Sequence, residues 1–204
     1  MTRTRTASAA ALALSAALLL AGCGMSVSPD STGSGDAGGA SAAPSTSAAP
    51  EVAPAAGETI TGTGYSFSVP EGWGVPSQEV VPSQVDVFAA DLTDVEDGFS
   101  DNVNVLLSPM GEITPDLVES AGVDELEASG ATEVTVGDRV DVAGSESAHL
   151  SAMFEQQGVQ YAIDQYYVTT DGQTFVVTFS FSPTVERAQR TEVAESVLAS
   201  WTWS

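Results

Sequence analysis

A histidine, a carboxylate and several hydroxyls fall on neighbouring segments of this sequence, and nucleophilic hydrolysis needs this combination. His149 is the single histidine, so any Ser–His–Asp mechanism must use it as the base. Strand pairing through a four-residue loop at 155–158 would set His149 opposite Asp164, and Asp164 opposite Thr178 on the next strand. Ser151 and Ser180 would lie nearby, so the row resembles a catalytic triad in residue type.

Other features favour an interpretation without catalysis. Flat strand faces rarely expose a nucleophile, and the chain has no Gly-x-Ser-x-Gly turn to present one. We also find no segment typical of an oxyanion hole. A cross-strand ion pair between His149 and Asp164, worth about 0.2–1 kcal/mol, is the preferred interpretation. We therefore assign no catalytic residue.

A second group of chemically active side chains is acidic. Five carboxylates crowd one stretch: Asp91, Asp94, Glu96, Asp97 and Asp101. Calcium prefers clustered carboxylate oxygens, but Glu96 and Gly98 stand where an EF-hand loop has its third and fifth ligands. No two carboxylates stand out as a glycosidase pair either. We expect a solvated acidic loop, with no metal and no cofactor.

The single cysteine follows a segment typical of exported proteins. Arg3 and Arg5 precede an apolar stretch from Ala7 to Leu20, and Ala21-Gly22 comes directly before Cys23. A basic start, an apolar middle and a small-residue end describe a secretory signal peptide. The apolar stretch has about 14 residues, fewer than the roughly 20 that a transmembrane helix needs.

The stretch from Leu18 to Cys23 resembles a bacterial lipobox. The resemblance implies transfer of a diacylglyceryl group to the Cys23 thiol and cleavage between Gly22 and Cys23, so that 1–22 is a lipoprotein signal peptide. Two acyl chains, such as palmitate, anchor a protein stably where one is marginal. We expect the mature chain at the extracytoplasmic face of the cell membrane. With Cys23 used in this way, no disulfide, cysteine nucleophile or zinc cluster remains.

The charge of the chain argues against several partners. The formal net charge is −23, with 28 acidic residues, five arginines and no lysine. Nucleic acids are bound by Lys and Arg that displace counterions, so we expect no nucleic-acid partner. Anionic lipid head groups are repelled for the same reason. The acyl anchor is therefore the expected contact with the membrane.

Composition changes sharply along the chain. Residues 23–57, after the lipidated Cys23, are rich in Gly, Ser, Ala and Pro. Such a segment buries too little apolar surface to order itself, so it should be a disordered tether. Residues 58–204 have the length of one domain and a regular apolar pattern. We expect an α+β domain there, an antiparallel sheet flanked by helices.

Alternating apolar residues predict short strands over 65–69, 85–89 and 102–107, and one bent or two short strands over 132–142. A strand that ends near Phe154 should follow, with longer strands over 159–169 and 173–182. A helix should start with Thr114 as N-cap and Pro115 in the first position, weaken at Gly122 and stop at Gly130.

A second helix, over about 184–199, should cover one face of the long hairpin. Its apolar stripe consists of Val193, Ala194, Val197, Leu198 and Trp201. The expected partner face consists of Phe175, Val177, Phe179 and Phe181. The opposite face, with Tyr166, Val168 and Val176, should be covered by the first helix or by a loop.

The register of the long hairpin depends on its turn. A two-residue turn at Asp171-Gly172 would pair Val168 with Phe175, and it would place the carboxylate of Asp164 among aromatic side chains opposite Phe179. A three-residue loop, with Gly172 in a left-handed bulge position, pairs Tyr167 with Phe175 and avoids this burial. We therefore predict the three-residue loop.

Several landmarks recur together in a known order. They are the runs 65–73 (YSFSVPEGW), 101–105 (DNVNV), 142–144 (VAG), 178–179 (TF) and 199–201 (ASW). In this order they resemble the LpqN/LpqT family of actinobacterial lipoproteins, over about residues 60–204. The resemblance implies a PsbP-like α+β sandwich and a non-enzymatic cell-envelope lipoprotein linked to glycolipids and their export. It brings no catalytic residues.

Aromatic residues at element ends are the candidates for ligand contact. Trp73, Tyr161, Tyr166 and Trp201 could line an apolar cleft between sheet and helix, which suits acyl chains, although core packing is their default role. We expect a protein that works by binding an envelope lipid or glycolipid. A protein-interaction accessory of an envelope complex is the alternative.

Overall fold

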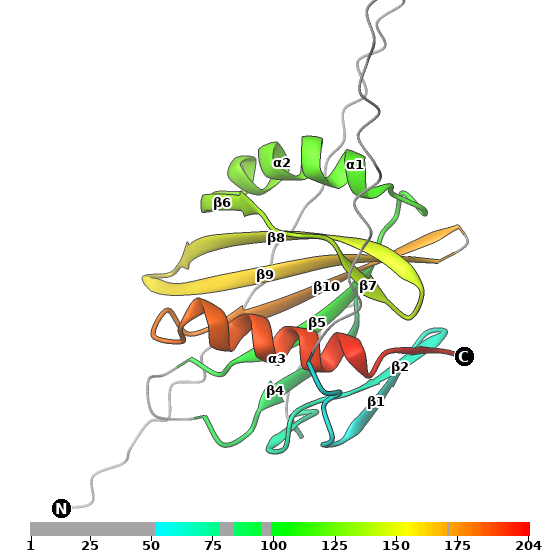
Figure 1. The fold of residues 1–204 in the computed structure, drawn as a ribbon. Coiled ribbons are helices and arrows are strands. Elements are labelled where there is room, and N and C mark those ends of the chain that lie inside the picture. The colour runs from blue at the N-terminus through cyan, green and yellow to red at the C-terminus, as the bar shows by residue number, and fades with distance from the viewer. Residues whose placement is uncertain (1–51, 78–83, 95–98, 171) are drawn as a thin grey trace, which may run out of the picture. The chain divides into compact units, whose positions relative to one another are not determined.

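The computed structural model describes residues 52–77, 84–94, 99–170 and 172–204. Within these ranges the chain forms two antiparallel sheets with helices packed against the larger one (Figure 1). The expected fold class, an antiparallel sheet flanked by helices, is therefore confirmed. Cys23, the predicted signal peptide and the predicted tether up to residue 51 lie outside the described residues.

The larger sheet has the strand order β3–β4–β5–β10–β9–β8–β6, and β7 also pairs with β8. Its strands are β3 (Trp73–Gly74), β4 (Val85–Asp91), β5 (Asn102–Leu107), β6 (Thr132–Val136), β7 (Val140–Val142), β8 (Ser145–Gln156), β9 (Val159–Thr170) and β10 (Gln173–Phe181). The predicted strands from residue 85 onward correspond to these elements, and 132–142 forms two short strands rather than one bent strand.

The smaller sheet joins distant parts of the sequence. It has the order β1–β2–β11, from β1 (Thr59–Gly62), β2 (Tyr65–Ser68) and β11 (Thr202–Trp203). Residues before β1 already belong to this unit, because the Ala55 amide donates to Ser196 O and the Gly57 amide to Val69 O, both at 2.8 Å. The contacts of the domain thus begin a few residues before the expected boundary at 58.

The helices are α1 (Pro115–Leu117), the π-helical turn η1 (Val118–Gly122), α2 (Val123–Ala128) and α3 (Arg187–Ala199). Thr114 is the N-cap of α1, as predicted, but its side chain makes no capping hydrogen bond. α3 begins later than predicted, because Ser182 and Val185 form a turn first. In the described ranges, no helix is both long and apolar enough to cross a bilayer.

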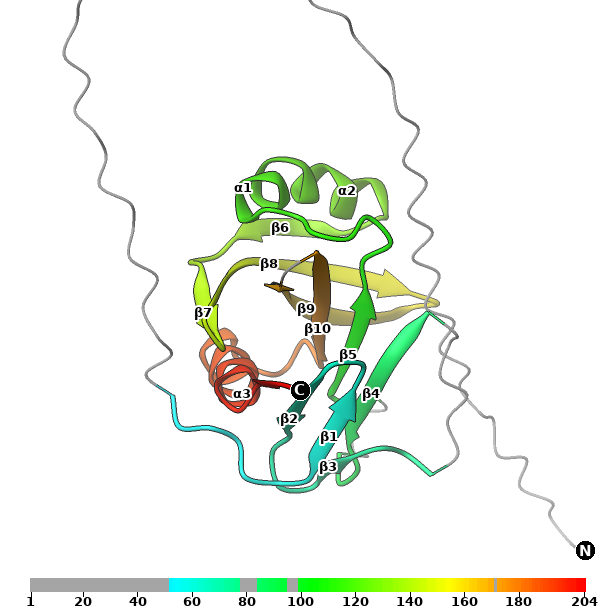
Figure 2. The ribbon, with the colours of Figure 1, turned by 90° about the vertical axis from the view of Figure 1, so that its right-hand side faces the viewer.

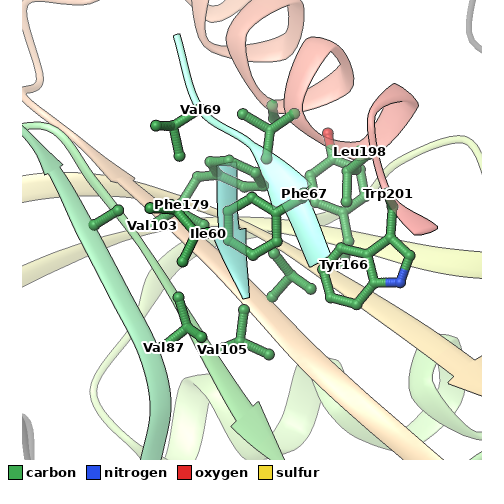
Figure 3. Close-up of a cluster of buried hydrophobic side chains, with 14 of the residues drawn as sticks. Ile60, Phe67, Val69, Val87, Val103, Val105, Tyr166, Phe179, Leu198 and Trp201 are labelled. Carbon is green, nitrogen blue, oxygen red and sulfur yellow. The ribbon is translucent and has the colours of Figure 1, made fainter. Parts of the chain in front are cut away.

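The larger sheet curves around α3 (Figure 2). The predicted stripe on α3 packs against Phe175, Val177, Phe179 and Phe181, in one buried cluster with the smaller sheet. Figure 3 shows this concave-face cluster, with Trp201 from the end of the helix stacked on Phe67. Trp201 also stacks on Tyr65, with ring centroids 4.3 Å apart. The predicted docking of the C-terminal helix is confirmed.

The other face of the sheet is covered by α1, η1 and α2. Val118 and Leu126 from this segment pack with Leu150 and Ile163 in a second buried cluster. Gly122 makes the close approach possible, because a Cβ at this position would lie 2.8 Å from Leu150 Cδ1. Gly122, which the sequence analysis identifies as a weak point of the helix, is therefore the last residue of the π-helical turn and the place where this segment touches the sheet.

Arg139 ties this helical segment to the sheet. Its guanidinium donates to Asp116 in α1, to Glu119 in η1 and to Glu146 in β8. Bidentate and shared pairing of this kind is the geometry that arginine favours. One arginine thus neutralises part of an acidic helix and joins it to a strand.

The predicted register of the long hairpin is wrong. Thr170 pairs with Gln173, so β9 and β10 are joined by a two-residue turn, and Phe175 lies opposite Val168 rather than Tyr167. Tyr166 and Val168 consequently lie on the α3 side, not on the opposite face. The sequence argument rejected this register because it buries Asp164 opposite Phe179. The structure supplies partners for that carboxylate from β8 and α3.

The turn between β8 and β9 is also shorter than predicted. Gln156 pairs with Val159, which leaves a two-residue turn of Gln157 and Gly158. Their φ angles are 54° and 83°, the positive pair that a type I′ turn requires. Phe154 therefore lies opposite Tyr161 instead of Val159, and β8 extends through the expected loop to Gln156.

Asp86 joins the two sheets. Its carboxylate accepts hydrogen bonds from the Thr63 amide, the Thr63 hydroxyl and the Tyr65 hydroxyl, at 2.8, 2.6 and 2.8 Å. Burial alone raises the pKa of Asp86, but these hydrogen bonds outweigh it and hold the pKa below its usual value. The β1–β2 turn is thus fastened to β4 by an ionised carboxylate.

We predict that Asp86→Asn lowers the free energy of unfolding by about 1–2 kcal/mol at pH 7, because a charged acceptor with three donors is lost. A lowered folded-state pKa contributes stability above the unfolded pKa and loses it as the pH falls. The difference between wild type and variant should therefore shrink below about pH 4. Urea unfolding of wild type and variant at pH 7 and below pH 4 measures this difference in the free energy of unfolding. Asp124→Asn, at an exposed position, is the control. An equal difference at both pH values would contradict this prediction.

Candidate functional site

Polar side chains from three elements meet inside the concave-face cluster. β8 supplies His149 and Ser151, β9 supplies Asp164, and α3 supplies Arg190. The alternation of side chains along a strand places His149 and Ser151 on one face of β8. Asp164 is only 1% exposed and Arg190 8%. An ionised pair is thus held almost entirely out of water.

The Asp164 carboxylate is surrounded by donors. Its Oδ1 accepts a hydrogen bond from the Ser151 hydroxyl and lies 3.1 Å from His149 Nε2. Its Oδ2 faces Arg190 Nε at 3.8 Å. Burial alone raises the pKa of Asp164, but the bonds from His149 and Ser151 and the charges of His149 and Arg190 outweigh it and lower the pKa. Asp164 is therefore ionised in the folded protein.

The His149 ring packs against Tyr166 and against the loop that contains Gly137. It stacks on Tyr166, with centroids 4.2 Å apart and planes 8° from parallel. A Cβ on Gly137 would lie 2.3 Å from His149 Nδ1, so the loop between β6 and β7 approaches the ring where glycine leaves room. The Gly137 amide also donates to His149 O at 2.8 Å.

The predicted contact between His149 and Asp164 is confirmed, but the two residues do not lie opposite each other, because His149 pairs with Tyr166. The geometry is also not that of a catalytic triad. In a triad the carboxylate binds Nδ1 of the histidine and the nucleophile binds Nε2. Here both Asp164 and Ser151 contact Nε2, at 3.1 and 3.2 Å. The Ser151 hydroxyl donates directly to Asp164, and it is only 2% exposed. The three residues form a structural hydrogen-bond network.

The remaining hydroxyls of the predicted row lie elsewhere. Thr178 lies opposite Gln165 on the other face of the sheet, where Gln165 Nε2 donates to its hydroxyl at 3.0 Å. Ser180 lies on that same face, because it is two residues further along β10. The prediction that Asp164 faces Thr178 is therefore wrong, and its direct neighbours across the strands are Ser151 and Phe179.

The sequence analysis did not identify two residues of this region, Arg190 and Glu195. Arg190 shares its face of α3 with Ala194 and Val197, which follow it by four and seven residues. A charge inside an apolar helical stripe is the signal that could have identified it. Glu195 lies on the same helix. Burial raises the pKa of Glu195, and the positive charge that His149 can carry lowers it less.

The four aromatic candidates lie in two clusters. Trp73, Tyr166 and Trp201 belong to the concave-face cluster. Tyr161 belongs to the cluster on the other face, where it stacks with Phe99 and Phe154. All four are less than 9% exposed. Because they do not share one face of the sheet, they do not line one cleft, and ligand contact by any of them stays a prediction.

The acidic stretch makes contacts with its own surroundings. Asp91 Oδ1 accepts bonds from the Thr93 amide and hydroxyl, and Asp101 Oδ1 accepts from the Ser182 amide. Glu96 and Asp97 lie outside the described residues. Among the residues that are described, no three His, Cys, Asp or Glu side chains are grouped to hold a metal ion.

No family model and no curated protein matches this sequence. Solved structures do match. LpqN of Mycobacterium tuberculosis is 16% identical, over 71% of this chain and 88% of that chain, with a TM-score of 0.50. Cyanobacterial PsbP from Synechocystis is 18% identical, over 78% and 99%, with a TM-score of 0.48.

A protein from Bacteroides thetaiotaomicron is 15% identical over 72% of this chain, with a TM-score of 0.46. This chain spans about half of that protein, 48% of its length. At such low identities the likeness concerns the fold alone. The fold of this chain, an antiparallel sheet curved around α3 (Figure 2), is similar to that of LpqN.

We predict that Gly137→Ala lowers the free energy of unfolding by about 1–3 kcal/mol, because the new methyl group overlaps the stacked ring of His149. Urea unfolding of this variant, of His149→Ala and of the double variant measures the coupling between the two positions. Gly137→Ala should lower the free energy of unfolding clearly less in the His149→Ala background, where the imidazole ring is absent. Equal costs in both backgrounds would refute this account of Gly137.

Proposed function

We propose that this chain is a membrane-anchored lipoprotein of the extracytoplasmic face that works by binding, not by catalysis, with an envelope lipid or glycolipid as its ligand. The stretch from Leu18 to Cys23 carries the anchoring part of the proposal. The signal peptide and the lipidated Cys23 place the domain outside the cytoplasm. The acidic surface makes the acyl chains its attachment to the membrane.

The arrangement of side chains around Asp164 supports the proposal that the protein works without catalysis. The only histidine of the chain is enclosed by Tyr166, Gly137 and Asp164. The serine hydroxyl beside it is buried and donates to the carboxylate instead of facing a substrate. A hydrolase would need an exposed nucleophile whose proton passes to the histidine. Binding is therefore the role that these residues favour.

The likeness to LpqN supports the envelope assignment. That protein is described as involved in cell envelope biogenesis of Mycobacterium tuberculosis, and it is similar to this chain in fold. The sequence landmarks between Tyr65 and Trp201 support membership of the same lipoprotein family. An envelope lipid or glycolipid is then the ligand class that the resemblance to this family favours.

Cys23→Ser should abolish incorporation of labelled palmitate when the chain is expressed in a bacterium with lipoprotein-processing enzymes. A hydroxyl is a much weaker nucleophile than the thiol, so diacylglyceryl transfer fails. The mass of the purified protein provides the second readout, since wild type should start at a lipid-modified residue 23. Ser26→Ala is the matched control and should label normally. Palmitate label that is retained in the Cys23→Ser variant would contradict the proposed lipid anchor at Cys23.

Native mass spectrometry of the membrane-purified chain, after incubation with envelope lipid extract, should show a retained lipid of defined mass. Apolar burial of acyl chains, at about 25 cal/mol per Å², favours such a complex. A lipid bound equally by an unrelated lipoprotein would count as non-specific. If the chain retains no lipid, this result would contradict the proposed lipid ligand. It would favour the alternative, a protein-interaction accessory of an envelope complex. The net charge of −23 supports that alternative.

A further inference from the structure

The contact between β9 and α3 contains buried polar atoms without hydrogen-bond partners. Asp164 Oδ2 and Arg190 Nε face each other, and neither has a partner among the described residues. The hydroxyl of Tyr166, on the same face of β9, is a further buried group without a partner. Buried polar groups in native proteins are nearly always hydrogen-bonded, so each of these atoms needs an explanation.

The distance between the two charged groups is the informative quantity. Arg190 Nε and Asp164 Oδ2 are 3.8 Å apart, whereas a direct N–H···O bond measures about 2.7–3.2 Å. For a polar contact longer than about 3.5 Å, a bridging water is the arrangement to consider. The other carboxylate oxygen, Oδ1, already accepts from Ser151 and contacts His149. Oδ2 is therefore the atom that has capacity for another donor.

We infer that a bound water molecule bridges Asp164 Oδ2 and Arg190 Nε, and that α3 docks on the sheet through this water. The water donates one hydrogen to Oδ2 and accepts the Nε–H of Arg190. Its second hydrogen remains for a neighbouring acceptor, and the buried Tyr166 hydroxyl is available on the same side of β9. Asp164 Oδ2 and Arg190 Nε then each have a hydrogen-bond partner without a direct contact.

The chemistry of the two partners selects water over an ion. The carboxylate repels an anion at this position, and the guanidinium repels a cation. The bridging group must also both donate and accept, since one partner is an acceptor and the other a donor. Asp164 and Arg190 are 1% and 8% exposed, so the group must be small. Internal waters with two to four polar partners meet all of these conditions.

A crystal structure of the chain, purified in detergent and solved at a resolution that shows ordered waters, tests the inference directly. We expect one density peak within about 2.7–3.2 Å of both Asp164 Oδ2 and Arg190 Nε. A direct bond between the two atoms, in the same distance range and with no such peak, would overturn the proposal.

Solution NMR of the same chain provides the independent measurement. The Arg190 Nε–H should show a dipolar cross peak to water with the sign of a long-lived contact. Arg139 is the internal control, because its Nε donates directly to Glu119 and its side chain is 28% exposed. Arg190→Lys should remove the Arg190 signal and leave that of Arg139. A cross peak from Arg190 that is no stronger than that of Arg139 would refute the bound water.

Discussion

The burial of one carboxylate constrains the rest of this structure. Removing Asp164 from water in an apolar cluster costs several kcal/mol unless donors surround it. The groups that compensate it come from two separate elements, with Ser151 and His149 on β8 and the charge of Arg190 on α3. A slip of one residue in the β8–β9 register would turn Asp164 to the other face of the sheet, away from all three. The hairpin register and the position of α3 are thus coupled through a single side chain.

Local patterning was sufficient to predict most elements of the fold. The strands and helices follow apolar periodicity, and Gly122 and Gly130 mark the irregular turn and the end of the second helical segment. The registers of the two hairpins were not predictable in the same way. The β9–β10 register depends on the burial of Asp164, and its compensating charge comes from Arg190, further along the sequence. The β8–β9 register depends on the length of its turn, which has two residues rather than four. A sequence argument that considers a carboxylate without its partners must reject the native register.

The candidate site was predictable only in part for a related reason. His149 and Asp164 could be brought together from strand alternation, and they do meet. Arg190 could not be paired with them, because the docking angle of α3 depends on packing against Phe175, Phe179 and their neighbours. The very short strands β3 and β11 carry too few residues for a periodic signal. Their pairing is decided by tertiary contacts of Trp73 and Trp201.

The smaller sheet has a consequence for the order of folding. β2 pairs with β11, so Tyr65 and Ser66 find their strand partners more than 130 residues later in the chain. The Tyr65–Trp201 stack closes at the same point. Contacts of such long sequence separation form slowly, because a large loop must close before they provide any stabilisation. The β8–β9–β10 meander is built from local hairpins and can assemble first. The aromatic centre of the domain is completed only when residues 201–203 reach β2. The pairing of β2 with β11 is therefore a late step of folding.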